Sequence, residues 1–225
     1  MKKVIVYGNA LLCKMLYYDA IDAADFEIAC FTVEKDYLRD RSELLGLPLI
    51  TFEEIQDTYP PQEYDMVVLF TGFRRMRERT EKYDLAKNKG YNLRNFISPK
   101  ADVTSDIIMG DNNIVLGQTH IGFGGTMGNN NLIRQHVYLG HEFKLGNHIE
   151  ITAGCTIGGE SEIGDLSYIG LGSTIINHTR IAYENLIGAG STVIRDTEPY
   201  SKNIGNPSRV IGYHQEEGVK MNVHK

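Results

Sequence analysis

The chain has 225 residues, of which 42% are apolar and 23% are charged, and its formal net charge is −6. This composition is typical of a globular protein and argues against both disorder and a protein held mainly by nucleic-acid phosphates. The longest plainly apolar run, Met66 to Phe70, is too short to cross a bilayer, and we expect neither a membrane span nor a cleaved leader. The three cysteines lack metal-type spacing, so we expect a reduced, cytoplasmic protein.

The first 95 residues alternate apolar runs with helical patterns. We expect strands at residues 2–8, 26–33, 47–50 and 64–70, and helices at 9–20, 52–57 and 74–88. Alternation of this kind predicts a small, doubly wound, Rossmann-like α/β domain over residues 1–95.

Sheets of this class bind ligands beyond the carboxyl ends of their strands. Gly8 and Asn9 follow the first expected strand, and Thr71 and Gly72 follow the last, so these four are the candidate substrate-binding residues. The G-x-G-x-x-G fingerprint is absent, which argues against hydride transfer with a dinucleotide. Gly8 could instead merely end its strand, whereas the helix N-termini that follow could hold a phosphate or a sugar nucleotide.

A repeat of six residues begins at Ile97 and ends at Val193. Only 13 of these 97 residues are charged, and every sixth residue is apolar, seventeen times without a break. A period of six fits neither a helix nor a lone strand, and it is typical of a parallel β-helix. The pattern resembles the left-handed β-helix, which we expect over residues 96–198, followed by a closing segment at 199–225.

The repeated aliphatic side chains are expected to point into this prism. Glycine follows the apolar residue at many hexads, for example Gly140, Gly158 and Gly170. We expect these glycines and small polar residues to relieve the corners, where positive φ or close backbone approach is needed.

One corner carries His141 beside Glu142. A neutral imidazole can accept a proton near neutral pH, and a neighbouring carboxylate can orient it, although such a histidine could also be a solvated surface residue. A zinc site is the competing interpretation, since His136 and His141 are five residues apart, as in prismatic carbonic anhydrases. The third histidine of that ligand set would stand at Lys100, so we expect no metal.

The order of α/β domain, prism and closing motif resembles bacterial sugar acyltransferases of the sialic-acid O-acetyltransferase type. These are close to the nucleotide-amino-sugar N-acetyltransferases of surface-glycan and lipopolysaccharide biosynthesis. The resemblance covers essentially the whole chain. It is carried by Ile97-Ser98-Pro99-Lys100-Ala101, by Leu139-Gly140-His141-Glu142 and by Gly205-Asn206-Pro207.

The resemblance implies a homotrimer with acetyl-CoA in the groove between neighbouring prisms, and direct acyl transfer. It makes His141 the general base and Glu142 the acidic neighbour that tunes it. The coenzyme-binding residues it implies are Gly159 near the thioester, Leu171 and Ala189 along the pantetheine arm, and Pro207 near the adenine.

Two departures from the family bear on the acceptor. Some relatives have a second histidine where this chain has Glu150. Some uridine-nucleotide members have paired aspartates after the second strand, where this chain has Thr32-Val33-Glu34-Lys35. We therefore expect an acetyl-CoA-dependent N-acetyltransferase of a nucleotide-linked amino sugar, without specifying the nucleotide or sugar. The alternatives are transfer to a hydroxyl group, a larger acyl group, a carbonic-anhydrase-like zinc enzyme, and a non-catalytic trimeric scaffold.

Overall fold

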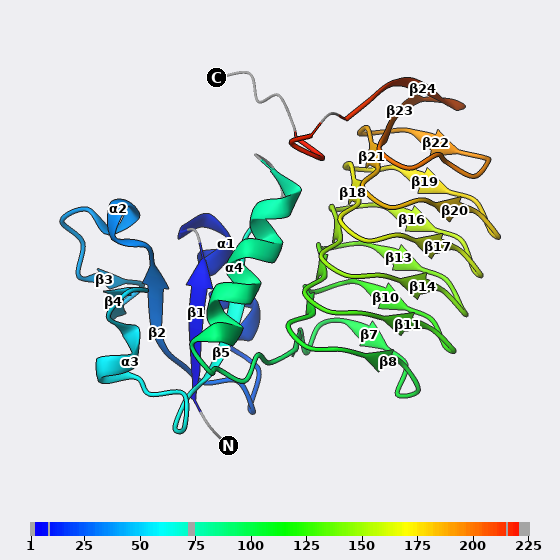
Figure 1. Cartoon of the computed structure of the whole chain (residues 1–225). Coiled ribbons are helices and arrows are strands. Elements are labelled where there is room, and N and C mark those ends of the chain that lie inside the picture. Colours follow the sequence, from blue (N-terminus) through cyan, green and yellow to red (C-terminus); the bar gives the residue numbers. More distant parts are fainter. Residues whose placement is uncertain (1–2, 9, 72–74, 215, 221–225) are drawn as a thin grey trace.

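The computed structural model describes residues 3–8, 10–71, 75–214 and 216–220. Figure 1 shows an N-terminal α/β unit lying beside a stack of triangular coils, with the long helix α4 (Met76–Asn88) between them.

The N-terminal unit is built on a five-stranded sheet with the strand order β3-β4-β2-β1-β5. Neighbouring strands run parallel, except that β3 is antiparallel to β4. The strands are β1 (Val4–Gly8), β2 (Ile28–Val33), β3 (Glu43–Leu44), β4 (Leu47–Thr51) and β5 (Asp65–Leu69). The other helices are α1 (Ala10–Ala20), α2 (Lys35–Leu38) and α3 (Ile55–Thr58).

Alternation along β1 separates the core of this unit into two layers. Val4 and Val6 pack in the layer that contains the apolar side of α1, whereas Ile5 and Tyr7 pack with Ala86 of α4. Successive side chains of a strand point to opposite faces, so both faces of the sheet are covered.

The repeat folds into coils of three short strands, which stack into three parallel sheets. Sheet 1 contains β7 (Asp102–Val103), β10 (His120–Ile121), β13 (Tyr138–Leu139), β16 (Thr156–Ile157), β19 (Thr174–Ile175) and β22 (Thr192–Val193). Sheet 2 contains β8 (Ile108–Met109), β11 (Thr126–Met127), β14 (Lys144–Leu145), β17 (Glu162–Ile163) and β20 (Arg180–Ile181). Sheet 3 contains β6 (Phe96–Ile97), β9 (Ile114–Val115), β12 (Leu132–Ile133), β15 (Glu150–Ile151), β18 (Tyr168–Ile169), β21 (Leu186–Ile187), β23 (Ser201–Gly205) and β24 (Ser208–Tyr213).

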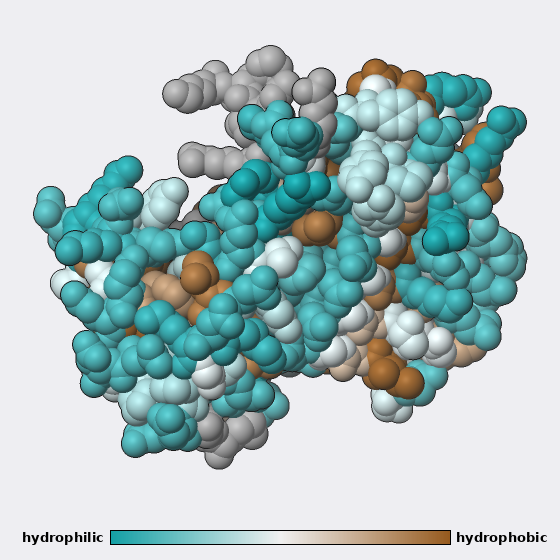
Figure 2. Space-filling view, in the orientation of Figure 1, coloured by the Kyte–Doolittle hydropathy of each residue, from teal (hydrophilic) through white to brown (hydrophobic). Residues whose placement is uncertain are grey.

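The repeated apolar residues form the core of the prism, as expected. From Val115 to Val193 every one of them is buried. Ile97 is instead 40% exposed, and Val103 and Met109 are only partly buried, because the first coil has no coil beneath it. Because most of these apolar residues are buried, they contribute little to the surface. Figure 2 shows one face of the molecule, on which hydrophilic side chains predominate and apolar patches are small and scattered.

The corners differ from expectation in one respect. Positive φ recurs every six residues, but three positions after the apolar residue, where Glu142, His148 and Gly154 stand. The glycines that directly follow the apolar residue instead allow the backbones of neighbouring coils to approach each other closely. A Cβ on Gly140 would lie 2.5 Å from the backbone nitrogen of Gly159 in the next coil, which no side chain tolerates.

Sheet 3 joins the prism to the N-terminal unit. Phe96, Ile114 and Leu132 are buried in the same apolar cluster as β1 and α1. The side chain of Asn112 accepts a hydrogen bond from the Val68 N–H at 2.8 Å and donates one to the Val68 carbonyl at 2.9 Å, so it pairs with β5 as a further strand would. The two parts of the chain therefore hold each other in a fixed arrangement.

The closing segment forms a hairpin and then returns to α4. β23 pairs with β21, and β24 turns back antiparallel to β23. Val219 is buried against Met76 and Tyr168, which ties the end of the described chain to the start of α4. Among the described residues no helix has the length and apolar character needed to cross a membrane.

Candidate functional site

His141 lies at the corner where the chain passes from sheet 1 to sheet 2, between β13 and β14. Its ring stacks on Phe123 of the preceding coil, with centroids 5.4 Å apart and planes 13° apart. Its Nδ1 lies 3.1 Å from Oε2 of Glu142, and its side chain is 41% exposed. Stacking and hydrogen bonding fix the ring while leaving it open to solvent.

Gly159 lies next to the other ring nitrogen, one coil farther along. A Cβ on this residue would lie 2.6 Å from Nε2 of His141, so only glycine leaves room for the ring. A hydrogen bond from Nδ1–H to Glu142 leaves Nε2 as the proton acceptor. The structure therefore brings His141, Glu142 and Gly159 together, with the free nitrogen on the Gly159 side.

Glu160 adds a second carboxylate to this corner. Ligand atoms of His141, Glu142 and Glu160 lie within 4.8 Å of one another, and within the described ranges these three form the one group of metal-ligating side chains so placed. His136 is not a member of it, and His120 pairs with Asp102 at 2.7 Å. The three-histidine arrangement considered from the sequence is therefore not formed among these residues.

The other coenzyme-binding candidates lie elsewhere on the prism. Leu171 and Ala189 are exposed on the corner from sheet 3 to sheet 1, one coil apart. Pro207 is exposed in the turn between β23 and β24. In one chain, sheet 1 thus separates Leu171 and Ala189 from the corner that carries His141.

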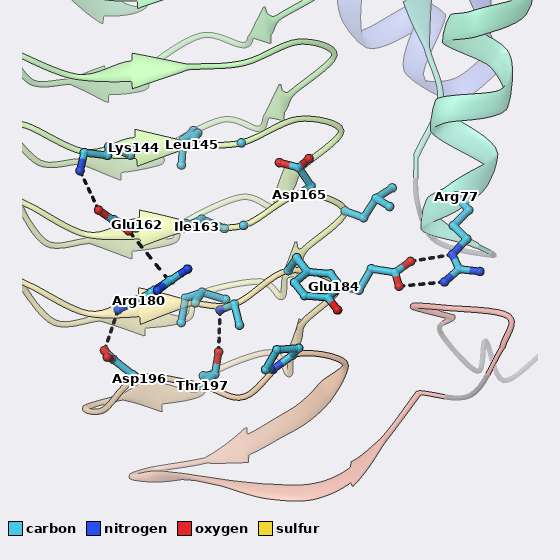
Figure 3. Close-up of a pocket in the computed structure, with 17 residues that line it drawn as sticks. Arg77, Lys144, Leu145, Glu162, Ile163, Asp165, Arg180, Glu184, Asp196 and Thr197 are labelled. Atoms are coloured by element: carbon cyan, nitrogen blue, oxygen red, sulfur yellow. Dashed lines mark hydrogen bonds and ion pairs between the residues drawn. The ribbon is translucent and has the colours of Figure 1, made fainter.

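Sheets 1 and 2 present contrasting surfaces. On sheet 1, His120 stacks on Tyr138 with ring centroids 5.3 Å apart, and the following strands expose threonines such as Thr156. Sheet 2 is charged, since Glu162 pairs with Lys144 at 2.7 Å and with Arg180 at 3.9 Å. Figure 3 shows these charges on the floor of a groove of about 920 Å³, which extends from Lys144 toward α4 and is not lined by His141.

The acceptor candidates lie at the carboxyl edge of the N-terminal sheet. Gly8 is buried at the end of β1, and a Cβ there would overlap the Leu69 carbonyl of β5, so this glycine is required by the sheet itself. Thr71 follows β5 and donates its hydroxyl hydrogen to the carboxylate of Glu150, with oxygens 2.9 Å apart. Asn9 and Gly72 lie outside the described residues.

Glu34, which stands after β2, is already engaged by its own chain. The hydroxyl of Tyr7 donates to its Oε1 at 2.7 Å, and Lys82 forms an ion pair with it. Burial raises the pKa of Glu34, but the hydrogen bonds from Lys82 and Tyr7 outweigh burial and hold the pKa below its ordinary value.

Sequence reasoning missed a charged group at the junction of the two parts. Glu150 is fully buried, Arg134 lies 3.7 Å from it, and Arg79 is 2% exposed. Burial lowers the pKa of Arg79 to about 10, although Glu150 opposes this shift. The sequence did contain one signal. Glu150 is aligned across neighbouring strands of sheet 3 with residues that have apolar or aromatic side chains, namely Ile114, Leu132, Tyr168 and Leu186. A carboxylate at this position is therefore unusual.

No protein-family model and no curated protein matches this sequence. Solved structures do match. The acetyltransferase domain of PglB from Neisseria gonorrhoeae is 22% identical, with 94% of this chain and 100% of that chain covered and a TM-score of 0.84. Perosamine N-acetyltransferase from Caulobacter crescentus, as a histidine-to-asparagine variant in complex with CoA and GDP-perosamine, is 22% identical, with 94% and 98% covered and a TM-score of 0.84. The chain has the fold of these acetyltransferases.

A third match extends this group. WeeI from Acinetobacter baumannii is 16% identical, with 93% of this chain and 100% of that chain covered and a TM-score of 0.69. The resemblance drawn from the sequence is thus confirmed in the fold, and the long series of parallel strands fits the left-handed β-helix of such acyltransferases. The PglB domain has also been solved in complex with acetyl coenzyme A.

Proposed function

We propose that this protein is an acetyl-CoA-dependent N-acetyltransferase that acts on the amino group of a nucleotide-linked sugar. The observation that carries the proposal is the His141–Glu142 pair, held on a rigid corner beside Gly159. It gains support from the fold, which is shared with a PglB domain solved with acetyl coenzyme A and with an enzyme solved with CoA and GDP-perosamine.

In this proposal Nε2 of His141 removes a proton from the sugar amine as the amine nitrogen attacks the thioester carbonyl. A C–N bond forms, the C–S bond breaks, and the coenzyme thiolate leaves and receives the proton from the imidazolium. Glu142 keeps Nδ1 protonated and stabilises the positive charge that develops on the ring. The N–H of Gly159 donates to the oxyanion, and no acyl-enzyme is formed.

We also propose that the groove is completed by a second copy in a homotrimer. One chain places His141 and Gly159 at one edge of sheet 1 and Leu171 and Ala189 at its other edge. The surface between them is poor in charge, in contrast to sheet 2, which suits burial against another copy. In a closed three-fold ring each copy offers its His141 edge to one neighbour and its Leu171 edge to the other.

The N-terminal unit would then supply the acceptor site. Its order of parallel strands with helices on both faces supports a Rossmann-like domain over residues 1–95, with the ligand at the carboxyl edge near Gly8 and Thr71. The prism at 96–198 and the closing segment at 199–225 would hold the coenzyme.

Incubation with acetyl-CoA and a panel of nucleotide-linked amino sugars tests this function. We expect thiol release that depends on the sugar, and an acetylated product that resists hydroxylamine, as an amide does and an ester does not. A product cleaved by hydroxylamine would show transfer to a hydroxyl group. Coenzyme binding without turnover on any sugar would indicate a scaffold, and stoichiometric zinc in the pure protein would favour the carbonic-anhydrase alternative.

A further inference from the structure

One charged group at the junction between the prism and the N-terminal unit brings together, among the described residues, the guanidinium groups of Arg79 and Arg134 and the carboxylate of Glu150. Arg79 reaches it from α4, and Arg134 and Glu150 reach it from neighbouring coils of sheet 3. Arg79 donates to the backbone carbonyls of Phe70 and Asn130, and because the residue is only 2% exposed, its Nε, which is unpaired among the described residues, is closed to a ligand. Within the described ranges, these two guanidinium groups face one carboxylate, that of Glu150, so positive charge is in excess among the three side chains.

Arg134 is the member of this group that combines unused hydrogen-bonding capacity with exposure to solvent. Among the described residues its Nε has no hydrogen-bond partner, and its NH2 group has one contact of this kind, with the sulfur of Met15 at 3.6 Å. The 3.7 Å between its NH1 group and Glu150 is longer than a good hydrogen bond. A guanidinium offers five N–H donors. The Nε of Arg134 is closed to solvent, so the donors open to an external acceptor are those of the terminal nitrogens, and NH1 makes no good hydrogen bond within the described residues.

The position of Arg134 is fixed by the coil. The backbone N–H of Arg134 donates to the Ile151 carbonyl at 2.9 Å, and the backbone carbonyl of Arg134 accepts a hydrogen bond from the Thr119 hydroxyl at 2.9 Å. Its side chain is 23% exposed, so it is sheltered but open to a ligand.

Both flanks of the expected acceptor site meet this group. Met15 belongs to α1, which follows Gly8 after one residue, and Thr71, which follows β5, binds the same Glu150 that faces Arg134. Arg134 therefore lies beside the carboxyl edge of the N-terminal sheet, although it belongs to the prism.

We propose that Arg134 is an anion-binding residue of the acceptor site and that it takes a phosphate oxygen of the nucleoside diphosphate moiety. This inference rests on the proposed function, because only a nucleotide-linked acceptor brings a diphosphate to this edge. Guanidinium is suited to the task, since it remains charged and presents paired donors to phosphate oxygens. In this assignment Glu150, which belongs to the prism, orients Arg134 and Thr71 and does not itself contact the ligand.

Calorimetric titration of the full-length protein with GDP, UDP, CDP and dTDP tests the assignment. We expect the wild type to bind at least one of them, and Arg134→Met to weaken that affinity by about ten- to a hundredfold, as loss of a charge-assisted hydrogen bond does. Arg134→Lys, which keeps the charge, should retain part of the affinity. Arg180→Met, at a 72% exposed arginine of sheet 2, is the matched control and should bind as the wild type does.

Three results would overturn the assignment. They are unchanged diphosphate affinity in Arg134→Met or Arg134→Lys protein, an equal loss of affinity for the corresponding phosphate-free nucleosides, and no binding of any of the four diphosphates by the wild type. Acetylation kinetics separate this inference from the proposed function. Turnover with an unchanged acceptor KM in Arg134→Met refutes the inference alone, whereas diphosphate binding that needs Arg134 without any acetyl transfer refutes the proposed function alone.

Discussion

His141 and His148 lie on successive corners of the same coil, yet their surroundings differ completely. α4 covers His148, whose ring meets Tyr83 edge to face at 5.4 Å and whose Nδ1 accepts a hydrogen bond from the Asn130 side chain at 2.9 Å. Burial, with the nearby Arg79, lowers the pKa of His148 to about 4. His141 instead stacks on Phe123, is 41% exposed, and keeps a carboxylate partner and a free nitrogen. The repeat decides where each side chain emerges, and the element packed on that corner decides its chemistry.

The largest expected effect comes from removing the uncovered histidine. His141→Ala should lower kcat by roughly 10²- to 10⁴-fold while leaving the fold intact, because loss of a general base has this range of effect. His178→Asn is a control, since His178 also pairs with a carboxylate, that of Glu160 at 3.4 Å, two coils farther along the same edge of the prism. Steady-state kinetics and circular dichroism check both variants. An unchanged kcat in His141→Ala protein would refute the assignment of the base.

Assembly should depend on sheet 1 and not on sheet 2. The wild type should have a mass of roughly 75 kDa by light scattering, three times the chain mass of 25.3 kDa. Thr156→Arg places three like charges in the proposed interface and should give monomers with activity lowered roughly tenfold or more. Thr126→Arg, at the equivalent exposed position of sheet 2, should leave mass and activity unchanged. A fully active wild-type monomer would contradict the shared groove.

The covered histidine should affect stability, and only in acid. Its folded pKa of about 4 lies below the ordinary value, so the unfolded chain takes up the proton first. The stabilisation is therefore fully present above pH 6.5, the ordinary histidine value, and is lost as the pH falls through 4. Urea unfolding measures the free energy of unfolding at pH 7 and at pH 5. The decrease in this free energy from pH 7 to pH 5 should be smaller in His148→Asn protein than in the wild type, by about 1 kcal/mol after allowance for solvent screening.

Two features make this difference interpretable. His214, whose pKa burial likewise lowers to about 4, is present in both proteins and cancels from the comparison. His136→Asn controls for placing Asn at a left-handed position, since His136 and His148 both have a φ of 59°. Identical pH dependence in wild type and His148→Asn protein would show that the burial of His148 does not govern its titration.

The prism and its exposed corner could be predicted from the sequence because both are local. A constant spacing of six fixes which residues enter the core, and the departures among the described residues lie in the first coil, at Ile97, Val103 and Met109. His141 and Glu142 are adjacent in the chain, so their pairing needs no knowledge of the fold. Glycine was expected at corners with positive φ, but Glu142 and His148 adopt that conformation themselves, since a regular coil can impose it on other residues.

The junction could not be predicted, because it depends on how two separately patterned parts dock. The sequence marks Glu150 only as a departure from some relatives and gives Arg134 no role, and their pairing becomes visible only when Thr71 and α1 are packed against them. The resemblance placed Gly159, Leu171 and Ala189 along a groove between neighbouring prisms, and a single chain holds them at opposite edges of sheet 1. The resemblance to known acyltransferases implied the site as a whole, and the structure shows which parts one chain provides.

Complementation between two defective chains tests the shared groove most directly. His141→Ala removes the base from one edge of sheet 1, and Ala189→Trp obstructs the other edge at an exposed residue without disturbing the core. Co-expressed in equal amounts, the two inactive variants should recover about a quarter of wild-type activity, because each groove then draws one edge at random from each of two chains. Activity no greater than that of the separate variants would show that each chain carries a complete site, which would contradict the account.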